Sequence, residues 1–447
     1  MTQTGIREVI AWEALDSRGR PTVACHVGLA GGAVGRAIVP SGASTGRHEA
    51  VELRDGGPRY GGSGVSEAVQ NVKTVLLPAV MGLDAADRVA VDTALEGTDG
   101  DPALSTVGAN AVLAVSLAVT LAAADAQGLS LWQALGGPRP LLPLPMVNMV
   151  SGGAHARGAL DIQDVLVVPH GARSFAEALE WAWRVRAATA DLLDERGGSS
   201  ALVADEGGLA GRLENNEAAL SLVVDGIFRA GFEPGRDVSL AIDLAANQFW
   251  TGEIYRLQAD HVELDRSAWL AVLAAWCGRY PIVSLEDVLQ EDDWVGWRDA
   301  SAELGGTRQL LGDDLFATGA GRLRRGIEEG VANAVLVKPN QAGTVTRAER
   351  VVQQARDAGY ATVVSARSGD TEDYWLADLA VGWRAGQIKV GSTMRSERTS
   401  KWNRLLEIES RAGAAAQFAG SAVLARFSAS SAGTPAVQVI DSERSDL

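Results

Sequence analysis

Short apolar runs that end in a charged or polar residue recur along the second half of the chain. They are VSLAID (238–243), IVSLED (282–287), QLLGDD (309–314), AVLVK (334–338), TVVSAR (362–367) and QIKVGS (387–392). The stretch 346–359, which ends at a glycine, has the amphipathic pattern of a helix between two strands. From Asp243 to Arg367 the successive charged ends are 43, 27, 25 and 29 residues apart. A spacing of about 25–30 residues is one strand-plus-helix unit, so the pattern predicts a βα repeat.

Two parallel architectures are built from such units. A doubly wound sheet is expected to carry a glycine-rich phosphate-binding sequence after its first strand, and no GxGxxG sequence is found. A (β/α)8 barrel places its working residues at the carboxyl ends of several strands, which is where the charged residues of this chain fall. The sequence therefore predicts an α/β fold with a (β/α)8 barrel.

The first 140 or so residues follow a different pattern. Alternating runs at 22–29 and 34–40, joined by a Gly-Gly turn, predict paired strands, and helical patterns follow them. A Gly/Pro-rich stretch at 136–145 then predicts a domain boundary. Because 447 residues exceed one ordinary core, we expect two domains: a smaller α+β domain over 1–138 and a barrel over 139–420. The Ala/Ser/Gly-rich sequence from about 414 predicts a loosely ordered end, with a C-terminal tail over 421–447.

The stretch 109–126 carries no charge before Asp125 and is long enough to span a membrane. It is mostly alanine, and Asn110, Ser116 and Thr120 are scattered through it. We therefore predict a buried helix and no membrane contact.

Composition limits which binding partners and which cellular compartment we expect for this protein. The formal net charge is −16 and the pI is near 4.9, which argues against nucleic acid and anionic membranes. A small anionic substrate would then need a local cationic pocket or a bound metal. Cys25 and Cys277 form neither a zinc motif nor a disulfide framework, and Arg7 and Glu8 interrupt any signal peptide. We expect a cytoplasmic protein.

Three acids at the ends of successive βα units predict a metal site. Asp243, Glu286 and Asp313 would meet at the barrel mouth, and oxygen ligands suit a hard cation such as Mg²⁺. Each acid alone is as well explained as the cap of the next helix. Capping explains less well why three acids in succession face lysine and arginine from the following strands.

The basic strand ends predict acid–base and anion-binding chemistry. Lys338 and Lys389 lie close to the metal site, where positive charge would lower a lysine pKa and make a general base; the alternative is simple charge balance. Arg367 and Ser368 offer a forked donor and a hydroxyl to a phosphate or carboxylate. Glu206 is a candidate proton donor or merely a turn residue, and 41–46 is a lid or an ordinary loop.

Taken together, several motifs make residues 5–420 resemble the enolase family. They are ALDSRGRPT (14–22), PSGASTGRHEA (40–50), GANAVLAVSLA (108–118), GGAHA (152–156), DIQD (161–164), DEGG (205–208), SLED (284–287), GDDLFAT (312–318), KPNQAGT (338–344), ARSGDTED (366–373) and the GQIKVGS segment. The resemblance implies an N-terminal capping domain on a barrel that begins with two antiparallel strands. It also implies an enolase-like hydro-lyase that is a homodimer or larger.

The resemblance also implies roles for individual residues, with a lysine base and Mg²⁺ as in enolase-superfamily sites generally. Lys338 would take the C2 proton, Lys389 would stabilise the dianion, and Glu206 would protonate the departing hydroxyl. Two Mg²⁺ ions are implied, the first held by Asp243, Glu286 and Asp313 and the second by Ser44. The remaining positions border the substrate: Asp164 beside the proton donor, with Gln163, His155, Arg367, Ser368 and Ala366 around the bound molecule.

The chain departs from the family pattern near the substrate's anionic end. Ala366 stands where the family has His, Asp164 where it has Glu, Arg20 where it has Asn, and Val288 where it has Gly or Pro. The hypothesis is a paralogue that dehydrates a 2-phosphorylated or 2-phosphonoformylated glycerate, forming a product such as carboxyphosphonoenolpyruvate. The alternatives are an ordinary glycolytic enolase that converts 2-phosphoglycerate and an inactive enolase-like binding protein.

Overall fold

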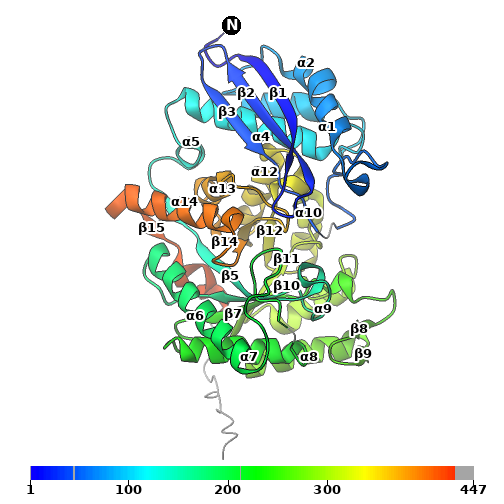
Figure 1. Cartoon of the computed structure of the whole chain (residues 1–447), viewed down its shortest axis with the longest axis vertical. Helices are drawn as coiled ribbons and strands as arrows, with labels where there is room; N and C mark the ends of the chain where they lie inside the picture. Colours follow the sequence, from blue (N-terminus) through cyan, green and yellow to red (C-terminus); the bar gives the residue numbers. More distant parts are fainter. Residues whose placement is uncertain (1, 44–45, 212, 428–447) are drawn as a thin grey trace, which may run out of the picture.

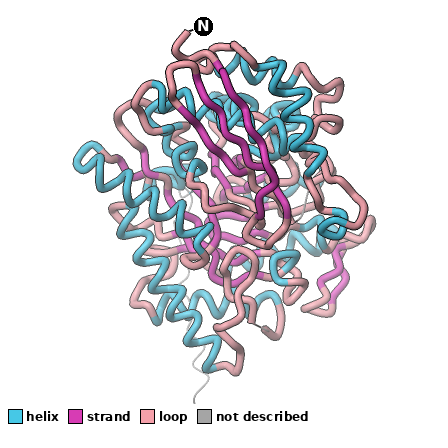
Figure 2. The backbone as a smooth tube through the Cα atoms, turned by 45° about the horizontal axis from the view of Figure 1, so that its top comes forward, coloured by secondary structure: helices cyan, strands magenta, loops and turns pink. Residues whose placement is uncertain are grey.

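The computed structural model describes residues 2–43, 46–211 and 213–427 and shows a small domain above a barrel (Figure 1). The small domain opens with an antiparallel sheet in the order β1 (Ile6–Leu15), β2 (Pro21–Leu29) and β3 (Val34–Ile38), as Figure 2 shows. Its helices follow: α1 (Ser66–Asn71), α2 (Leu77–Val80), α3 (Arg88–Glu96), α4 (Ala109–Ala126) and α5 (Leu131–Gly136).

Helix α4 forms the core of this domain and packs against β2 and β3. A Cβ atom on Gly35 of β3 would lie 2.0 Å from the carbonyl oxygen of Ala118, so only glycine permits this approach of strand to helix. The helix is long and apolar enough to cross a membrane, but 78% of it is buried inside the protein. It is the buried helix that the sequence predicts.

The second domain is a closed barrel, which confirms the predicted fold. Its strands follow the order β10, β11, β12, β13, β14, β5, β6, β7, and only the pairs made by β6 are antiparallel. The barrel therefore begins with two antiparallel strands, as the family resemblance implies. The bounds are β5 (Leu144–Ser151), β6 (Asp164–Val168), β7 (Ser239–Asp243), β10 (Ile282–Glu286), β11 (Gln309–Gly312), β12 (Ala334–Val337), β13 (Ala361–Ser365) and β14 (Gly386–Gly391).

Helices surround the barrel on its outer face (Figures 1 and 2). They are α6 (Phe175–Glu195), α7 (Asn216–Arg229), α8 (Arg266–Arg279), α9 (Trp294–Leu304), α10 (Ala320–Glu329), α12 (Val345–Asp357), α13 (Trp375–Gly382) and α14 (Ser396–Ala412). The short helix α11 (Pro339–Ala342) lies instead at the barrel mouth and contacts α4 of the small domain. Two small sheets complete the fold, one of β4 (Leu141–Leu142) with β15 (Gln417–Phe418) and one of β8 (Tyr255–Leu257) with β9 (Val262–Leu264).

The chain after residue 414 is more ordered than its composition predicts. Residues Gly420–Phe427 form a 3-10 helix whose Leu424 and Phe427 are buried against the barrel interior. They close the end of the barrel where Leu144 and Ala334 begin their strands. The expectation of a loosely ordered end from 414, and of a tail from 421, is therefore wrong as far as Phe427, because two apolar side chains seal an otherwise open floor.

The two domains meet at the loop that follows β13. Ser41 and Gly369 exchange backbone hydrogen bonds of 2.8 and 2.9 Å, and the backbone N–H of Ile38 donates to Asp373 at 2.6 Å. A Cβ atom on Gly369 would lie 2.1 Å from the Asp16 carboxylate, so this contact requires glycine. These bonds hold residues 41–43 and 46–50 over the carboxyl ends of the strands.

Candidate active site

Three carboxylates meet at the carboxyl ends of β7, β10 and β11. Asp243 and Glu286 are paired in register as the last residues of their strands, and Asp313 directly follows β11. All three are at most 7% exposed. None caps a helix: Asp293 caps α9, and Gly319 precedes α10.

Two lysines share these carboxylates. The Lys389 ammonium donates to Asp243 at 2.6 Å and to both oxygens of Glu286 at 2.9 Å, and Lys338 pairs with Asp313. Burial and the charge of Asp243 raise the pKa of Glu286 well above its usual value. Negative charge is therefore in excess, and the donors are hard oxygens. This donor set fits a divalent cation, which would compete with both lysines for the same oxygens.

The expected lowering of the lysine pKa is not seen. Burial disfavours the charged ammonium of Lys338, but the Asp313 carboxylate outweighs that cost and raises the pKa of Lys338. The same balance, with Asp243 and Glu286 as partners, raises the pKa of Lys389 well above its usual value. In the chain alone each lysine is paired with an acid, so the lowering expected beside a bound divalent metal and a second lysine stays a prediction.

A chain of polar groups lies beside β5 and β6, which are separated in the barrel from β12 and its Lys338 by β13 and β14. Ser151 donates to Asp164 at 2.6 Å, Asp164 bonds the Nδ1 atom of His155 at 2.9 Å, and the Nε2 atom of His155 lies 3.8 Å from Glu206. Burial opposes the imidazolium, but Asp164 and Glu206 raise the pKa of His155 to about 9. Although burial opposes ionisation of Glu206, His155 and Arg398 leave the pKa of that carboxyl lowered. Glu206 is thus ionised beside a protonated histidine.

Arg367 and Ser368 occupy the end of the cavity nearest the small domain. Arg367 is 3% exposed, and its Nη1 atom donates to Glu49 at 2.8 Å and to Asn340 at 3.2 Å. The hydroxyl of Ser368 accepts from the backbone N–H of Ala43 at 2.5 Å and from Arg18 at 3.4 Å. The site's guanidinium and hydroxyl are therefore held by residues of the small domain.

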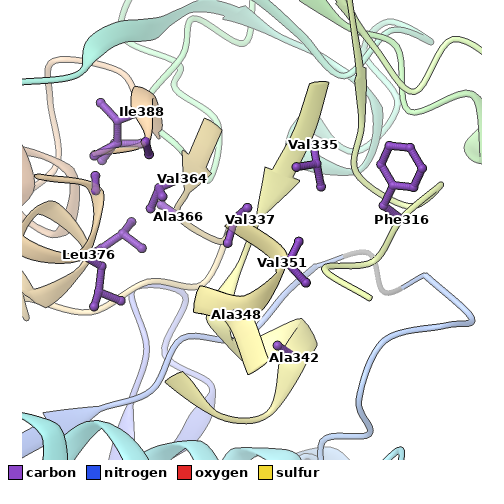
Figure 3. Close-up of a cluster of buried hydrophobic side chains, with 14 of the residues drawn as sticks. Phe316, Val335, Val337, Ala342, Ala348, Val351, Val364, Ala366, Leu376 and Ile388 are labelled. Carbon is purple, nitrogen blue, oxygen red and sulfur yellow. The ribbon is translucent and has the colours of Figure 1, made fainter. Parts of the chain in front are cut away.

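Ala366 lies between this cavity and an apolar layer behind it. It is 4% exposed, and its backbone N–H donates to the Lys389 carbonyl at 2.9 Å. Figure 3 shows it in the same apolar cluster as Val364, Leu376 and Ile388. An imidazole here would have to enter that layer or the cavity, which measures about 20 Å³.

Most of the predicted residues meet around this one cavity. It is lined by His155, Gln163, Glu206, Asp243, Lys338, Ser365, Ala366, Arg367, Ser368 and Lys389. Asp164, Glu286 and Asp313 lie directly behind it, joined by the bonds to His155, Lys389 and Lys338 described above. Gln163 donates to Asp243 at 3.1 Å. Ser44 lies outside the described residues, so its role stays a prediction.

Several supporting residues were missed from the sequence. Gln341 donates to Asp313 at 2.8 Å, and Glu49 contacts both Gln341 and Arg367. Asp287 has a positive φ of 46°, and its carboxylate accepts the backbone N–H of Asp313 at 3.0 Å. Each of these residues lies inside a quoted motif that also contains a residue with an assigned role. Their position within a motif was the available signal. They were missed because the sequence argument selected residues at strand ends, and none of them ends a strand.

A second group of acids lies at the surface between the domains. His48 contacts Asp292 at 3.0 Å, and Glu291 is close to both. Arg47 pairs with Glu291 at 2.9 Å and Arg322 with Asp292 at 3.0 Å. Two arginines already balance these acids, so the group is an ion-pair network.

Both domains match models of one family along nearly their whole length. Residues 6–135 match "Enolase, N-terminal domain" and residues 139–427 match "Enolase, C-terminal TIM barrel domain". The chain belongs to the enolase family. It is also 50% identical over 430 residues to a protein named "Enolase" from Acidothermus cellulolyticus, covering 96% of this chain and 99% of that protein.

Family membership makes this protein an enolase-type hydro-lyase. The family uses a divalent metal and small phosphorylated substrates and forms oligomers. The buried carboxylates at the barrel mouth are consistent with that use of metal.

Proposed function

We propose that the chain removes water from a glycerate that carries a phosphorus group at C2. Lys338 takes the C2 proton, and Lys389 stabilises the negative charge that develops on the substrate carboxylate. Both lysine side chains reach the cavity, and each is paired with a carboxylate. Lys338 must lose its own proton before it can act as the base, and a cation held by Asp313 would offset the negative charge that raises the Lys338 pKa. Two Mg²⁺ ions, the first on Asp243, Glu286 and Asp313, would supply electrophilic stabilisation of the same carboxylate.

The opposite wall supplies the acid. Glu206 must gain a proton before it can protonate a departing C3 hydroxyl, and His155 is the nearest protonated group. Asp164 holds the Nδ1 side of the ring, so the Nε2 side faces Glu206. The pair therefore offers a proton donor on the face opposite Lys338, as a dehydration with separate base and acid requires.

The proposed substrate is a 2-phosphonoformylated glycerate, which would give carboxyphosphonoenolpyruvate. The observation that carries this proposal is Ala366, which lines the cavity beside Arg367 and Ser368. Its side chain is only a methyl group, so it leaves more room than a larger side chain would at the end of the cavity proposed to hold the phosphorus group. An added carboxylate on phosphorus would use that space. Arg157 lines a different pocket with Trp250 and is not among the residues around this cavity. Arg18, which donates to Ser368, is the nearer cation.

The second candidate function is that of an ordinary enolase acting on 2-phosphoglycerate. The 50% identity to the Acidothermus cellulolyticus "Enolase" over nearly the full length favours it. In that case Ala366 is a tolerated substitution without meaning for the substrate.

The deciding experiment compares kcat/KM for 2-phosphoglycerate and its 2-phosphonoformyl analogue. We expect wild type to prefer the analogue, and Ala366→His to shift the preference toward 2-phosphoglycerate by about tenfold, because a ring closes the space. Ala415→His, at an exposed position, is the matched control and should change nothing. Wild-type turnover of 2-phosphoglycerate at the rate of ordinary enolases would establish the second candidate.

The same assay tests the remaining alternative, an inactive binding protein. That alternative predicts Mg²⁺ binding without turnover of either substrate. The retained base, acid and metal carboxylates support activity. The proposal also includes a homodimer or larger assembly and a cytoplasmic location, which sedimentation and cell fractionation would test.

A further inference from the structure

One carboxylate of the small domain contacts both ends of the site. Glu49 is 8% exposed. It accepts from Arg367 twice, at 2.8 Å from Nη1 and at 3.3 Å from Nη2, and from the Gln341 amide at 3.3 Å. It also accepts the backbone N–H of Gly46 at 2.9 Å.

The ion pair between Glu49 and Arg367 restricts the orientation of the Arg367 guanidinium in the cavity. A guanidinium has two forked edges, and Glu49 takes the edge formed by Nη1 and Nη2. Asn340 holds Nη1 on the same side at 3.2 Å. Glu49 therefore helps to fix the plane in which the guanidinium faces the cavity. Without Glu49, the guanidinium would lose the two bonds that hold this edge.

The second arm of Glu49 reaches the metal carboxylates. The Gln341 amide that donates to Glu49 also donates to the Oδ1 atom of Asp313 at 2.8 Å. Thr318 donates to the Gln341 carbonyl oxygen at 2.6 Å, so the amide cannot turn without losing a bond. Glu49 and Asp313 are therefore joined through a single, fixed amide.

We propose that Glu49 is a positioning residue that aligns the anion-binding Arg367 and the metal-binding Asp313 through one buried carboxylate. The proposal rests on the proposed function, which assigns those two roles. It predicts that a change at Glu49 alters phosphate binding and Mg²⁺ binding together, although Glu49 itself binds neither phosphate nor Mg²⁺.

The experiment measures binding, so that it does not depend on which substrate is turned over. Mg²⁺ and inorganic phosphate are titrated calorimetrically into the full chain for wild type, Glu49→Gln and Glu49→Asp. We expect Glu49→Gln to weaken both affinities about 10-fold or more, as loss of an outer-shell partner does. Glu49→Asp keeps the charge with a shorter reach and should recover part of the loss.

A matched control separates positioning from lost stability. Asp378 is 1% exposed and pairs with Arg404 through two bonds of 2.8 Å, far from the site, so Asp378→Asn removes a similar ion pair. It should lower the melting temperature and leave both affinities unchanged. Unchanged Mg²⁺ and phosphate affinities in folded Glu49→Gln, or equal losses in Asp378→Asn, would overturn the proposal.

A double-mutant cycle provides the second test. If Glu49 acts on phosphate through Arg367, Glu49→Gln should cost much less in an Arg367→Lys background than in wild type. Additive losses would contradict the proposal. Failure of the proposed function would show differently: neither glycerate would be turned over, while these binding differences would persist.

Discussion

Lys338 and Glu206 both line one cavity, but Lys338 directly follows β12, whereas Glu206 lies beside β5 and accepts a bond from its Asn148. These different positions assign them to different proton transfers. We predict that Lys338→Ala abolishes exchange of the substrate's C2 proton with solvent. Glu206→Gln should slow elimination yet retain exchange, because the base is still present. Exchange in deuterated buffer, followed by NMR, measures both. Equal loss of exchange in the two variants would contradict separate roles.

His155 gives the protein a pH dependence on the alkaline side. Its pKa is about 9 in the fold and about 6.5 in an unfolded chain, so the folded protein holds the proton more tightly. The resulting stability, at most about 3 kcal/mol, is fully present below pH 6.5 and is lost as the pH rises through 9. Urea unfolding between pH 6 and 10 measures it.

His155→Gln is the control for that measurement, because it cannot titrate. Its unfolding free energy should lack the decline between pH 6.5 and 9 that wild type shows. The same decline in both proteins would assign the effect to other groups.

Sequence reasoning at the residue scale found side chains with recognisable chemistry and missed those that act through contacts. Lys338 and the three metal acids are found because they end or directly follow strands, and Lys389 is found because it is a charged residue within an apolar run, inside β14. Glu49 is missed because it lies on a loop of the other domain, and only folding brings it to Arg367. The raised pKa of Lys338 in the chain alone was not foreseen for the same reason, since its partner Asp313 comes from another strand.

At the scale of elements, the contact of β3 with α4 depends on one glycine. A methyl group on Gly35 would lie 2.0 Å from the Ala118 carbonyl and 2.4 Å from the Ala122 nitrogen. We predict that Gly35→Ala lowers the free energy of unfolding by about 2 kcal/mol or more, because the backbone must shift. Denaturant unfolding measures the loss.

Gly278 in α8 is the matched control, because nothing lies within 4 Å of a Cβ atom there. Gly278→Ala should be neutral or stabilise the helix by up to about 1 kcal/mol. A similar loss in both variants would show that backbone contact is not the cause.

The apolar runs predicted the barrel strands well, because the runs are almost entirely buried. β13, for example, is Ala361–Ser365 and overlaps the predicted run at 362–367 over four residues. The closing segment Gly420–Phe427 was not predicted, because its Ala/Ser/Gly-rich sequence has no periodic pattern. Its order comes from the barrel floor that it covers, which is a tertiary effect.

At the scale of the whole molecule, the excess of buried acid near Glu286 links metal binding to stability. A ligand that binds only the folded state stabilises it by about 2.7 kcal/mol at 100 times its Kd. We predict that Mg²⁺ raises the melting temperature and that chelation reverses the rise and removes activity. Differential scanning calorimetry measures the shift.

Asp313→Asn tests whether that effect arises at the predicted carboxylates. A neutral amide is a poorer ligand for a hard cation, so the variant should need more Mg²⁺ for the same rise and should be slower. Asp84→Asn, at a surface acid of the small domain, should respond to Mg²⁺ as wild type does. Full activity after exhaustive chelation would show the metal assignment to be wrong.

The closure of the barrel floor by Leu424 and Phe427 has a practical side. These residues sit where the strands begin, and the catalytic cavity lies where the strands end. A support or reporter attached at the exposed Ala425 of this segment would therefore lie on the face opposite the cavity. Immobilised through that position, the protein would keep its mouth open to the surrounding solution, with substrate diffusion unobstructed by the matrix.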